Sequence, residues 1–361
     1  MEKYRVGIVG ATGMVGQRFI SLLKDHPWFE VNCVAASARS AGKTYREAVG
    51  ERWAFSWEIP EKVAGMTVVD AADVDEVSKH VDFVFCAVDM KKDEIRALEE
   101  AYAKHEIPVV SNNSACRGIE DVPMVVPEIN ADHLAVIETQ KKRLGTKKGF
   151  IAVKPNCSIQ SYVPALTPLL DFEPEKVSVC TYQAISGAGK TFKTWPEMVD
   201  NVIPYIGGED EKSENEPLKL WGHVEDGKIV NAVLPVISAQ CLRVACSDGH
   251  MAAVSVSFKK KPTIEQIKER WANYETEAQR LELPSAPKPF LQYFEDPSRP
   301  QTRLDRDFQN GFGVSIGRLR EDKLFDYRFV CLSHNTVRGA AGGGILTAEL
   351  LCRKGYIPHR V

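Results

Sequence analysis

The chain has 361 residues, and at about 100–200 residues per domain this length predicts two domains, each able to bury its own core. Hydrophobic residues make up 44% and charged residues 26%, which is typical of a soluble globular protein and argues against a disordered, collagen-like or coiled-coil chain. The formal net charge is only −3, so the composition favours a small-molecule ligand over a nucleic acid.

The sequence shows no sign of membrane targeting or of a metal site. No apolar run approaches the length of a membrane span, and residues 1–5 pass directly into a strand pattern without a signal-peptide core. The protein is therefore expected in the cytoplasm. Nine cysteines are scattered without a CxxC pair or a zinc-like His–Cys spacing, so no metal is predicted. In a reducing compartment most of them are expected to be small buried hydrophobic residues.

Short β-branched runs alternate with amphipathic helical stretches in the first half of the chain. The runs lie at residues 4–9, 29–34, 81–86 and 108–110. Such alternation predicts βαβ units and a parallel sheet.

The second half has a different pattern from about Lys176. The runs Val177–Tyr182 and Met251–Phe258 are longer and alternate, which fits a mixed or antiparallel sheet with one covered face. Between them, the Gly- and Glu-rich segment 207–216 is compatible with a loop or with the start of a helix. Residues 336–344 predict a flexible glycine-rich loop, followed by a terminal helix that could return to the first domain.

A glycine-rich segment, GATGMVG at residues 10–16, follows the opening strand and precedes an amphipathic helix. Glycines at such a junction allow a tight turn and a close backbone approach, so that the helix N-terminus can bind a pyrophosphate. The spacing is GxxGxxG rather than GxGxxG, and an ordinary strand-to-helix turn is the alternative. Its place between strand and helix favours dinucleotide binding. The expected cofactor contacts are Gly10, Thr12, Gly13, Met14 and Val15.

The segment about twenty residues further on indicates whether the protein prefers NADP or NAD. An NAD site usually offers an acidic residue to the ribose at this place. This chain has Ser37, Arg39 and Ser40 there instead. Hydroxyls beside a guanidinium suit a 2′-phosphate, because Arg presents a planar fork of donors to an anion. The segment therefore favours NADP over NAD, with a solvated loop and an incidental arginine as the alternative.

Cys157 has the most suggestive surroundings of the nine cysteines. It lies in the run KPNCSIQ, with apolar residues following at helical spacing. A helix N-terminus lowers the pKa of a cysteine thiol and favours the thiolate nucleophile, which suits acyl transfer. A buried structural cysteine is the alternative.

A thiolate nucleophile needs a proton partner, and His250 is the best placed of the eight histidines because it follows a glycine turn and opens a strand. Arg243 is suited to bind a substrate carboxylate, or to pair with a surface acid. Gln183 precedes the small-residue run AISGAG and is suited to orient a carbonyl or the nucleophile. A satisfied histidine and a hydrogen-bonded buried amide are the alternative interpretations.

These motifs together resemble the aspartate-β-semialdehyde dehydrogenase family, over essentially the whole chain and in the same order. The resemblance is carried by GATGMVGQRF, SARSAGK, SNNSACRG, KPNCSIQ, YQAISGAG, GGEDEKSENEPLK, RVACSDGH and HNTVRGAAGGG. The Asn156–Cys157 pair and the seven-residue step from Arg243 to His250 make it specific. Within that family, this sequence is similar to the branch typical of archaea and fungi.

The resemblance implies an α/β fold with a Rossmann-type parallel-sheet NADP-binding domain and an α+β catalytic and dimerisation domain with a mixed sheet. The implied ranges are 1–155, rejoined by a C-terminal helix at 335–361, and 156–334. The implied activity is the reversible, NADPH-dependent reductive dephosphorylation of L-aspartyl 4-phosphate to L-aspartate 4-semialdehyde, in lysine, threonine, methionine and isoleucine biosynthesis. A homodimer or homotetramer is implied as well.

The resemblance also implies roles for individual residues. Cys157 would form a thioacyl intermediate, His250 would act as acid and base, and Gln183 would orient the intermediate. The implied substrate contacts are Arg243 and Glu209 for the amino-acid portion, Arg117 and Lys212 for the phosphate, and Asn156 beside both ligands. The further implied cofactor contacts are Asn113, Ser186, Gly187, Asn335 and Gly339. Asp210 beside Glu209 leaves that assignment open by one position.

Three other functions are weighed against this one. Acyl-CoA reductases of the malonyl-CoA type have a similar scaffold, cysteine and histidine, but Asn156 and segment 207–216 favour the phosphate substrate. N-acetylglutamyl-phosphate reductases resemble the chain less. A non-catalytic NADP-binding sensor has no need for a nucleophile with a proton partner. The run Lys190–Pro196 departs from the pattern expected of the branch, and its role is left open.

Overall fold

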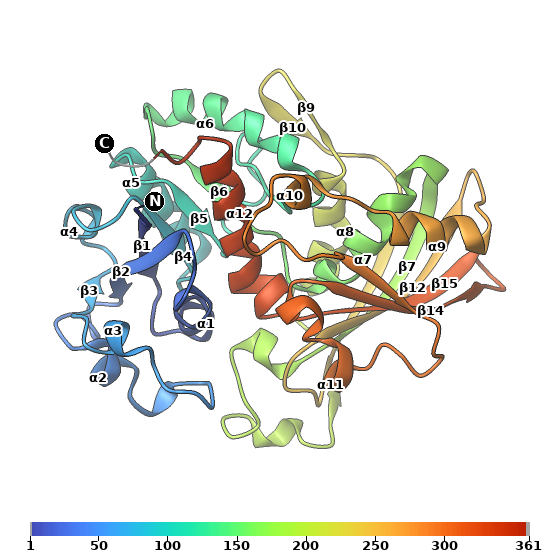
Figure 1. Ribbon diagram of the computed structural model, residues 1–361, viewed down its shortest axis with the longest axis horizontal. Coiled ribbons are helices and arrows are strands. Elements are labelled where there is room, and N and C mark those ends of the chain that lie inside the picture. Colours follow the sequence, from blue (N-terminus) through green and yellow to red (C-terminus); the bar gives the residue numbers. More distant parts are fainter. Residues whose placement is uncertain (1, 359–361) are drawn as a thin grey trace.

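The computed structural model describes residues 2–358, which contain two large β-sheets, each with its own helices, and a separate two-stranded hairpin (Figure 1). Met1 and residues 359–361, which belong to the predicted domain ranges, lie outside the described residues. The first sheet is parallel and the second is mixed, so the predicted α/β fold class is confirmed.

The first sheet has six parallel strands in the order β3-β2-β1-β4-β5-β6. They are β1 (Tyr4–Val9), β2 (Phe29–Ala36), β3 (Val69–Asp70), β4 (Phe83–Cys86), β5 (Val109–Ser111) and β6 (Ile151–Val153). The strand order reverses between β1 and β4. Open α/β sheets bind ligands outside the carboxyl ends of the strands at this switch point, which is where the glycine-rich segment 10–16 lies.

The helices of the first half are α1 (Met14–Leu23), α2 (Tyr45–Val49), α3 (Glu61–Ala64), α4 (Val74–Ser78), α5 (Lys92–Lys104) and α6 (Ile137–Leu144). The C-terminal helix α12 (Gly342–Arg353) returns to this half and packs beside α1 and β5 (Figure 1). Its Ile345 and Leu350 share one hydrophobic cluster with Phe19 and Phe85. The terminal helix therefore packs on the first half of the chain.

The glycine-rich segment before α12 is not the flexible loop predicted from the sequence. Residues Val337–Ala341 form a π-helical turn that continues into α12, and this stretch is almost entirely buried. The glycines lack side chains, which allows the segment to pack directly on its neighbours instead of remaining exposed.

The second sheet has seven strands in the order β13-β14-β15-β12-β7-β11-β8. They are β7 (Pro174–Gln183), β8 (Val202–Ile203), β11 (Val236–Val244), β12 (His250–Phe258), β13 (Leu291–Phe294), β14 (Val314–Glu321) and β15 (Tyr327–Ser333). A separate hairpin consists of β9 (His223–Glu225) and β10 (Lys228–Val230). Alternate residues of β7 and β12 are buried, including Val177, Val179, Val254 and Val256, as expected for a sheet with one covered face.

The helices of the second half are α7 (Tyr162–Leu166), α8 (Glu209–Leu220), α9 (Ile264–Ala272), α10 (Glu277–Arg280) and α11 (Thr302–Asp305). Helix α8 packs on β11 and answers the open question about segment 207–216, because the helix begins at Glu209. No helix within residues 2–358 combines the length and the apolarity needed to span a bilayer.

Candidate active site

Strand pairing brings three of the predicted site residues to one end of the seven-stranded sheet. Arg243 of β11 pairs with Gln183 of β7, and the antiparallel pairing of β12 with β7 places His250 beside Gln183. All three side chains are buried. The Gln183 amide donates to Thr181 Oγ1 at 3.2 Å. These residues are far apart in the chain, and the sheet register alone makes them neighbours.

Cys157 reaches this group from the other sheet, because it follows β6 and precedes a three-residue 3₁₀ turn. Its Sγ lies 3.5 Å from Nε2 of His250. The backbone N–H of Ala184 donates to Nδ1 of the same ring at 3.1 Å, so the neutral imidazole carries its hydrogen on Nε2, facing the sulfur. The predicted nucleophile and its predicted proton partner are thus in contact.

The expectation that a helix dipole lowers the pKa of the Cys157 thiol is wrong. The helical turn after Cys157 is short, and burial raises the pKa of the thiol, with a smaller effect from Glu209 in the same direction; Lys154 and Arg243 oppose it. Burial and the positive charge of Arg243 lower the pKa of His250 to about 3. In the free protein the two groups are therefore a neutral thiol and a neutral imidazole.

Ala184 binds Arg243 and His250 through its backbone, and Gly187 leaves room for both side chains. Arg243 Nη1 donates to the Ala184 carbonyl at 2.7 Å, while the N–H of the same residue binds His250. A Cβ atom built on Gly187 would lie 2.9 Å from Arg243 Nη1 and 3.0 Å from His250 Nε2. Only glycine therefore fits at this position without displacing one of the two functional side chains.

The glycine-rich segment before and within α12 packs directly on Cys157 and Lys154. A Cβ atom on Gly339 would lie 2.8 Å from Cβ of Cys157, and one on Gly343 would lie 3.2 Å from Cδ of Lys154. The buried Lys154 was missed by sequence reasoning, although it precedes the nucleophile by three residues. Burial, and then the charge of Arg117, lower the pKa of its ammonium to about 7.

Asn335 connects the loops around His250. Its side-chain carbonyl accepts the N–H of Gly249 at 2.7 Å, and its amide donates to Ser186 Oγ at 2.8 Å. Ser186 is therefore linked, through Asn335, to the residue that precedes His250. The three predicted residues Ser186, Gly187 and Asn335 do lie together at the same end of the sheet as the Cys157–His250 pair.

Helix α8 presents polar side chains to the loop that carries the nucleophile. Glu209 Oε1 accepts from the Asn156 amide at 3.0 Å and from Lys212 Nζ at 2.8 Å. Asp210 faces the sheet instead, where its carboxylate accepts the N–H of Cys241 at 2.8 Å. Glu209, and not its neighbour, is therefore the acidic residue that faces the site.

The same face of α8 holds two charged residues, Glu216 and Lys219, that sequence reasoning missed. Arg117 Nη1 donates to Glu216 Oε1 at 2.9 Å, and the backbone N–H of Asn156 donates to the other carboxylate oxygen. Lys219 Nζ donates to three carbonyls of the loop that begins with Arg117. A signal was present in the sequence: charged residues at positions 209, 212, 216 and 219 recur at helical spacing.

The predicted pyrophosphate turn has the geometry that such a ligand needs. Gly10 has φ +91°, and a Cβ atom there would lie 2.3 Å from the Ala87 carbonyl oxygen. A Cβ atom on Gly16 would lie 2.3 Å from the Gly10 oxygen, so both glycines allow the helix to sit close to the strand. Gly13 begins α1 without a side-chain cap, which leaves backbone N–H groups available to an anion. Thr12 belongs to the same turn, and Met14 and Val15 are the first two residues of α1.

Ser37, Arg39 and Ser40 form a turn directly after β2, at the same carboxyl edge of the sheet. Ser37 and Arg39 are exposed, whereas Ser40 is buried and its N–H donates to the Ser37 carbonyl at 2.8 Å. An exposed guanidinium at this edge fits the 2′-phosphate of an adenosine ribose bound across β1 and β2.

Asn113 is oriented by a buried carboxyl that sequence reasoning also missed. Its amide donates to Cys86 Sγ at 3.3 Å and to Glu99 Oε1 at 3.0 Å. Ser111 Oγ donates to the same oxygen, and burial raises the pKa of Glu99. Because both amide hydrogens are engaged, Asn113 can offer a ligand only its carbonyl oxygen, which suits a hydroxyl or amide donor and not a phosphate.

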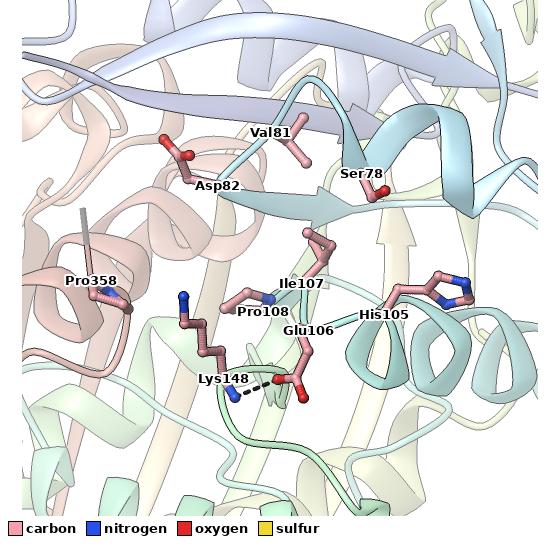
Figure 2. Close-up of a pocket in the computed structure, with 9 residues that line it drawn as sticks. All are labelled: Ser78, Val81, Asp82, His105, Glu106, Ile107, Pro108, Lys148 and Pro358. Atoms are coloured by element: carbon pink, nitrogen blue, oxygen red, sulfur yellow. Dashed lines mark hydrogen bonds between the residues drawn. The ribbon is translucent and has the colours of Figure 1, made fainter. Parts of the chain in front are cut away.

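The pocket shown in Figure 2 lies away from these residues. Its lining residues, among them Asp82, Ile107 and Lys148, precede β4, β5 and β6 and therefore mark the amino ends of the strands. None of the predicted site residues lines it. Within residues 2–358 no group of three His, Cys, Asp or Glu side chains could hold a metal ion.

Comparison with known families places the chain in a class. The NAD binding domain of semialdehyde dehydrogenases matches residues 5–137, and the semialdehyde dehydrogenase dimerisation domain matches residues 166–338. These matches and the contact between Cys157 and His250 define a semialdehyde dehydrogenase.

The relatives narrow the class. The aspartate-semialdehyde dehydrogenase of Aspergillus fumigatus is 44% identical over 98% of this chain and 99% of its own. That of Archaeoglobus fulgidus is 43% identical over 98% of this chain and all of its own. The crystal structure of the Candida albicans enzyme with NADP has 40% identity and a TM-score of 0.89, covering 99% of this chain and 100% of that one. The chain belongs to the aspartate-semialdehyde dehydrogenase family, as the motifs indicated.

Proposed function

We propose that the protein catalyses the reversible, NADPH-dependent reductive dephosphorylation of L-aspartyl 4-phosphate to L-aspartate 4-semialdehyde and phosphate, in lysine, threonine, methionine and isoleucine biosynthesis. The observation that carries this proposal is the 3.5 Å contact between Cys157 Sγ and His250 Nε2, in which His250 is buried and Cys157 is half-buried. A nucleophile and a proton partner in this geometry serve acyl transfer. The names of the relatives supply the substrate class.

The distribution of charge around the pair fits a substrate with two anionic ends. Arg243 lies against His250 and would bind the α-carboxylate, and Glu209 would bind the α-ammonium. Arg117 and Lys212 would bind the phosphate. Both of these cations are connected to Asn156, through Glu216 and Glu209 respectively, and therefore lie on the same side of the nucleophile.

The residues of the chain account for the covalent steps. The Cys157 sulfur attacks the 4-carbonyl carbon and forms a C–S bond. The C–O bond to phosphate breaks, and phosphate leaves with the electron pair and takes up the thiol proton as hydrogen phosphate. The backbone N–H of Ser158 already donates to Asn156 Oδ1 at 2.7 Å, so it is not free for the oxyanion. Gln183 would orient the thioester. Bound NADPH supplies the hydride that reduces it. His250 Nε2 faces the sulfur, so we assign to this atom the transfer of the thiohemiacetal hydroxyl proton and assistance to thiolate release.

The proposed cofactor contacts lie at the carboxyl edge of the first sheet, where the strand order reverses, and around Cys157. The backbone of Gly10, Thr12, Gly13, Met14 and Val15 would hold the pyrophosphate. Ser37, Arg39 and Ser40 would hold the 2′-phosphate. Asn113, Ser186, Gly187, Asn335 and Gly339 would surround the nicotinamide end. The last four lie around the Cys157–His250 pair, which supports this assignment for them. The Candida albicans enzyme was crystallised with NADP, which supports this choice of cofactor.

We also propose the domain division, the assembly and the location given above: residues 1–155 with 335–361, residues 156–334, a homodimer or homotetramer, and the cytoplasm. The packing of α12 on the first sheet supports the division. Large apolar side chains are exposed on and around β8 and β11, including Tyr205 at 72%, Val233 at 87% and Val236 at 63%, and a surface of this kind favours a protein partner. All nine cysteines are unpaired, which fits a reducing compartment.

The test of the proposed function is a comparison of two substrates. The purified protein is assayed for phosphate-dependent NADP reduction by L-aspartate semialdehyde and, separately, for NADPH oxidation with malonyl-CoA. We expect only the first reaction, and its loss in Cys157→Ala. Turnover only with the CoA thioester would assign the scaffold to acyl-CoA reduction, and turnover with neither, despite NADP binding, would favour a sensor.

A further inference from the structure

We propose that Glu216 is the positioning residue of the phosphate site: its carboxylate holds the Arg117 guanidinium and the backbone of Asn156 as one unit. This inference rests on the proposed function, in which Arg117 binds the phosphate. Glu216 itself does not contact substrate in this account. It acts through Arg117 and through the residue that precedes the nucleophile.

The carboxylate of Glu216 makes one contact through each oxygen. Oε1 accepts from Arg117 Nη1 at 2.9 Å, and Oε2 accepts from the backbone N–H of Asn156. The side chains of the ion pair are only 10% and 11% exposed, so water replaces neither contact easily. Charge-assisted hydrogen bonds of this kind are stronger than neutral ones and fix geometry as well.

The Arg117 guanidinium still has an N–H group that no acceptor within residues 2–358 uses and that is available to a ligand. A guanidinium has five N–H groups in one plane. Nη1 is bound to Glu216, and Nη2 donates to the Asn112 carbonyl at 3.0 Å. Nε is buried and has no hydrogen-bond partner among the described residues. A buried donor without an acceptor is unfavourable, so the geometry calls for an anionic acceptor at the Nε edge, and a phosphate oxygen meets this need.

The same carboxylate also fixes the nucleophile's loop. Asn156 is held at its backbone N–H by Glu216 and at its side chain by Glu209, at 3.0 Å. Its side-chain oxygen accepts the N–H of Ser158 at 2.7 Å, so the residues on both sides of Cys157 belong to this network. The carboxylate of Glu216 therefore connects the cation of the proposed phosphate site with the loop that carries the attacking sulfur.

Positioning and simple electrostatics make opposite predictions for this residue. Glu216→Gln removes one negative charge close to the phosphate, so a carboxylate that only repels phosphate would, on removal, lower the KM for phosphate. A glutamine can accept from Arg117 or from Asn156 but presents its NH2 group to the other donor. If Glu216 positions the site, the KM for phosphate rises instead. Glu216→Asp keeps the charge but withdraws it by one methylene, so only positioning predicts a rise here.

The experiment measures the KM for phosphate, for L-aspartate semialdehyde and for NADP in the phosphorylating direction. Wild type, Glu216→Gln and Glu216→Asp are compared with Glu211→Gln, an exposed position on the same helix. We expect the KM for phosphate to rise about tenfold or more in both Glu216 variants, as the loss of a charged hydrogen bond implies. The other two KM values should stay within about twofold of wild type, and Glu211→Gln should leave all three unchanged.

The outcomes separate the inference from the proposed function. A KM for phosphate that is unchanged or lower in both Glu216 variants, with phosphate-dependent turnover intact, would overturn the positioning role alone. An equal rise of all three KM values would also overturn it, because that indicates general damage to the fold. Absence of phosphate-dependent turnover in the wild type would instead refute the proposed function.

Discussion

His250 Nε2 lies 3.5 Å from Cys157 Sγ, while Nδ1 of the same ring accepts the N–H of Ala184 at 3.1 Å. The Ala184 contact opposes protonation of Nδ1, and burial acts in the same direction on the pKa of the ring. Proton transfer from thiol to imidazole is therefore unfavourable in the free protein. In the proposed reaction the thiol proton therefore leaves with the phosphate as the C–S bond forms.

This relationship predicts the pH dependence of Cys157 alkylation. Because burial raises the pKa of the thiol, the rate constant for modification by iodoacetamide should keep rising through pH 9. Peptide mass spectrometry measures the rate at Cys157 separately from the other eight cysteines, with Cys157→Ser as the control for labelling at this site. A rate that reaches its plateau below pH 7 would show a thiolate–imidazolium pair and contradict the account.

Gly187→Ala should impair catalysis without unfolding the protein. The new Cβ atom would lie within 3.0 Å of both Arg243 and His250, and a displacement of about 1 Å in a catalytic group can reduce turnover about 100-fold. Gly207→Ala is the matched control, since its Cβ atom would come no closer than 3.6 Å to a neighbour. Steady-state kinetics and thermal unfolding are measured on both. Wild-type turnover in Gly187→Ala would mean that the observed close packing does not constrain the site.

The ion pair between Glu128 and Arg338 should be important for stability. Both side chains are almost fully buried, at 0% and 1% exposure, and the guanidinium also lies over the ring of Phe290, 4.7 Å from its centre. Glu128→Ala leaves the buried Arg338 charge without its partner, and we expect a loss of about 3–5 kcal/mol in the free energy of unfolding. Urea denaturation measures it.

The control for Glu128→Ala is Glu61→Ala, which breaks the exposed pair with Arg46. Exposed pairs contribute about 0–1 kcal/mol, so this variant should unfold almost like wild type. Equal losses in the two variants would show that burial does not set the contribution of the Glu128–Arg338 pair.

The exposed apolar surface around β8 and β11 should be a subunit interface. Val236→Lys places a charge on this surface and should shift the protein toward monomer in sedimentation experiments. Leu324→Lys changes an equally apolar side chain, 89% exposed, in the turn between β14 and β15, and should leave the assembly unchanged. A wild-type protein that sediments as a monomer would contradict the prediction that this surface is a subunit interface.

Two predictions about the site rested on motifs with a strong local signal. The turn at Gly10 was predicted from a local glycine motif. The pairing of Cys157 with His250 was predicted from their local sequences and from the family resemblance. Lys154 carried no such signal, and for Glu216 the helical spacing of charged residues indicated a helix face but not what that face contacts. Their importance depends on a helix and a glycine-rich segment from distant parts of the chain meeting around one loop.

Burial explains the two predictions that failed. The pKa of Cys157 was expected to fall because a helix follows it, but desolvation has the larger effect, and the extent of desolvation depends on packing by Gly339 from the far end of the chain. The same packing turns the predicted flexible loop into a buried helical segment. A sequence shows that a glycine permits close approach, but not which residue approaches.

The most direct test of the account is to trap the acyl enzyme. The protein is incubated with L-aspartate semialdehyde and NADP in the absence of phosphate, digested at low pH and examined by mass spectrometry. We predict one aspartyl group per chain on the peptide that contains Cys157, released when phosphate is added, and absent in Cys157→Ser. An aspartyl group on another cysteine, or phosphate-dependent turnover that persists in Cys157→Ser, would contradict the account.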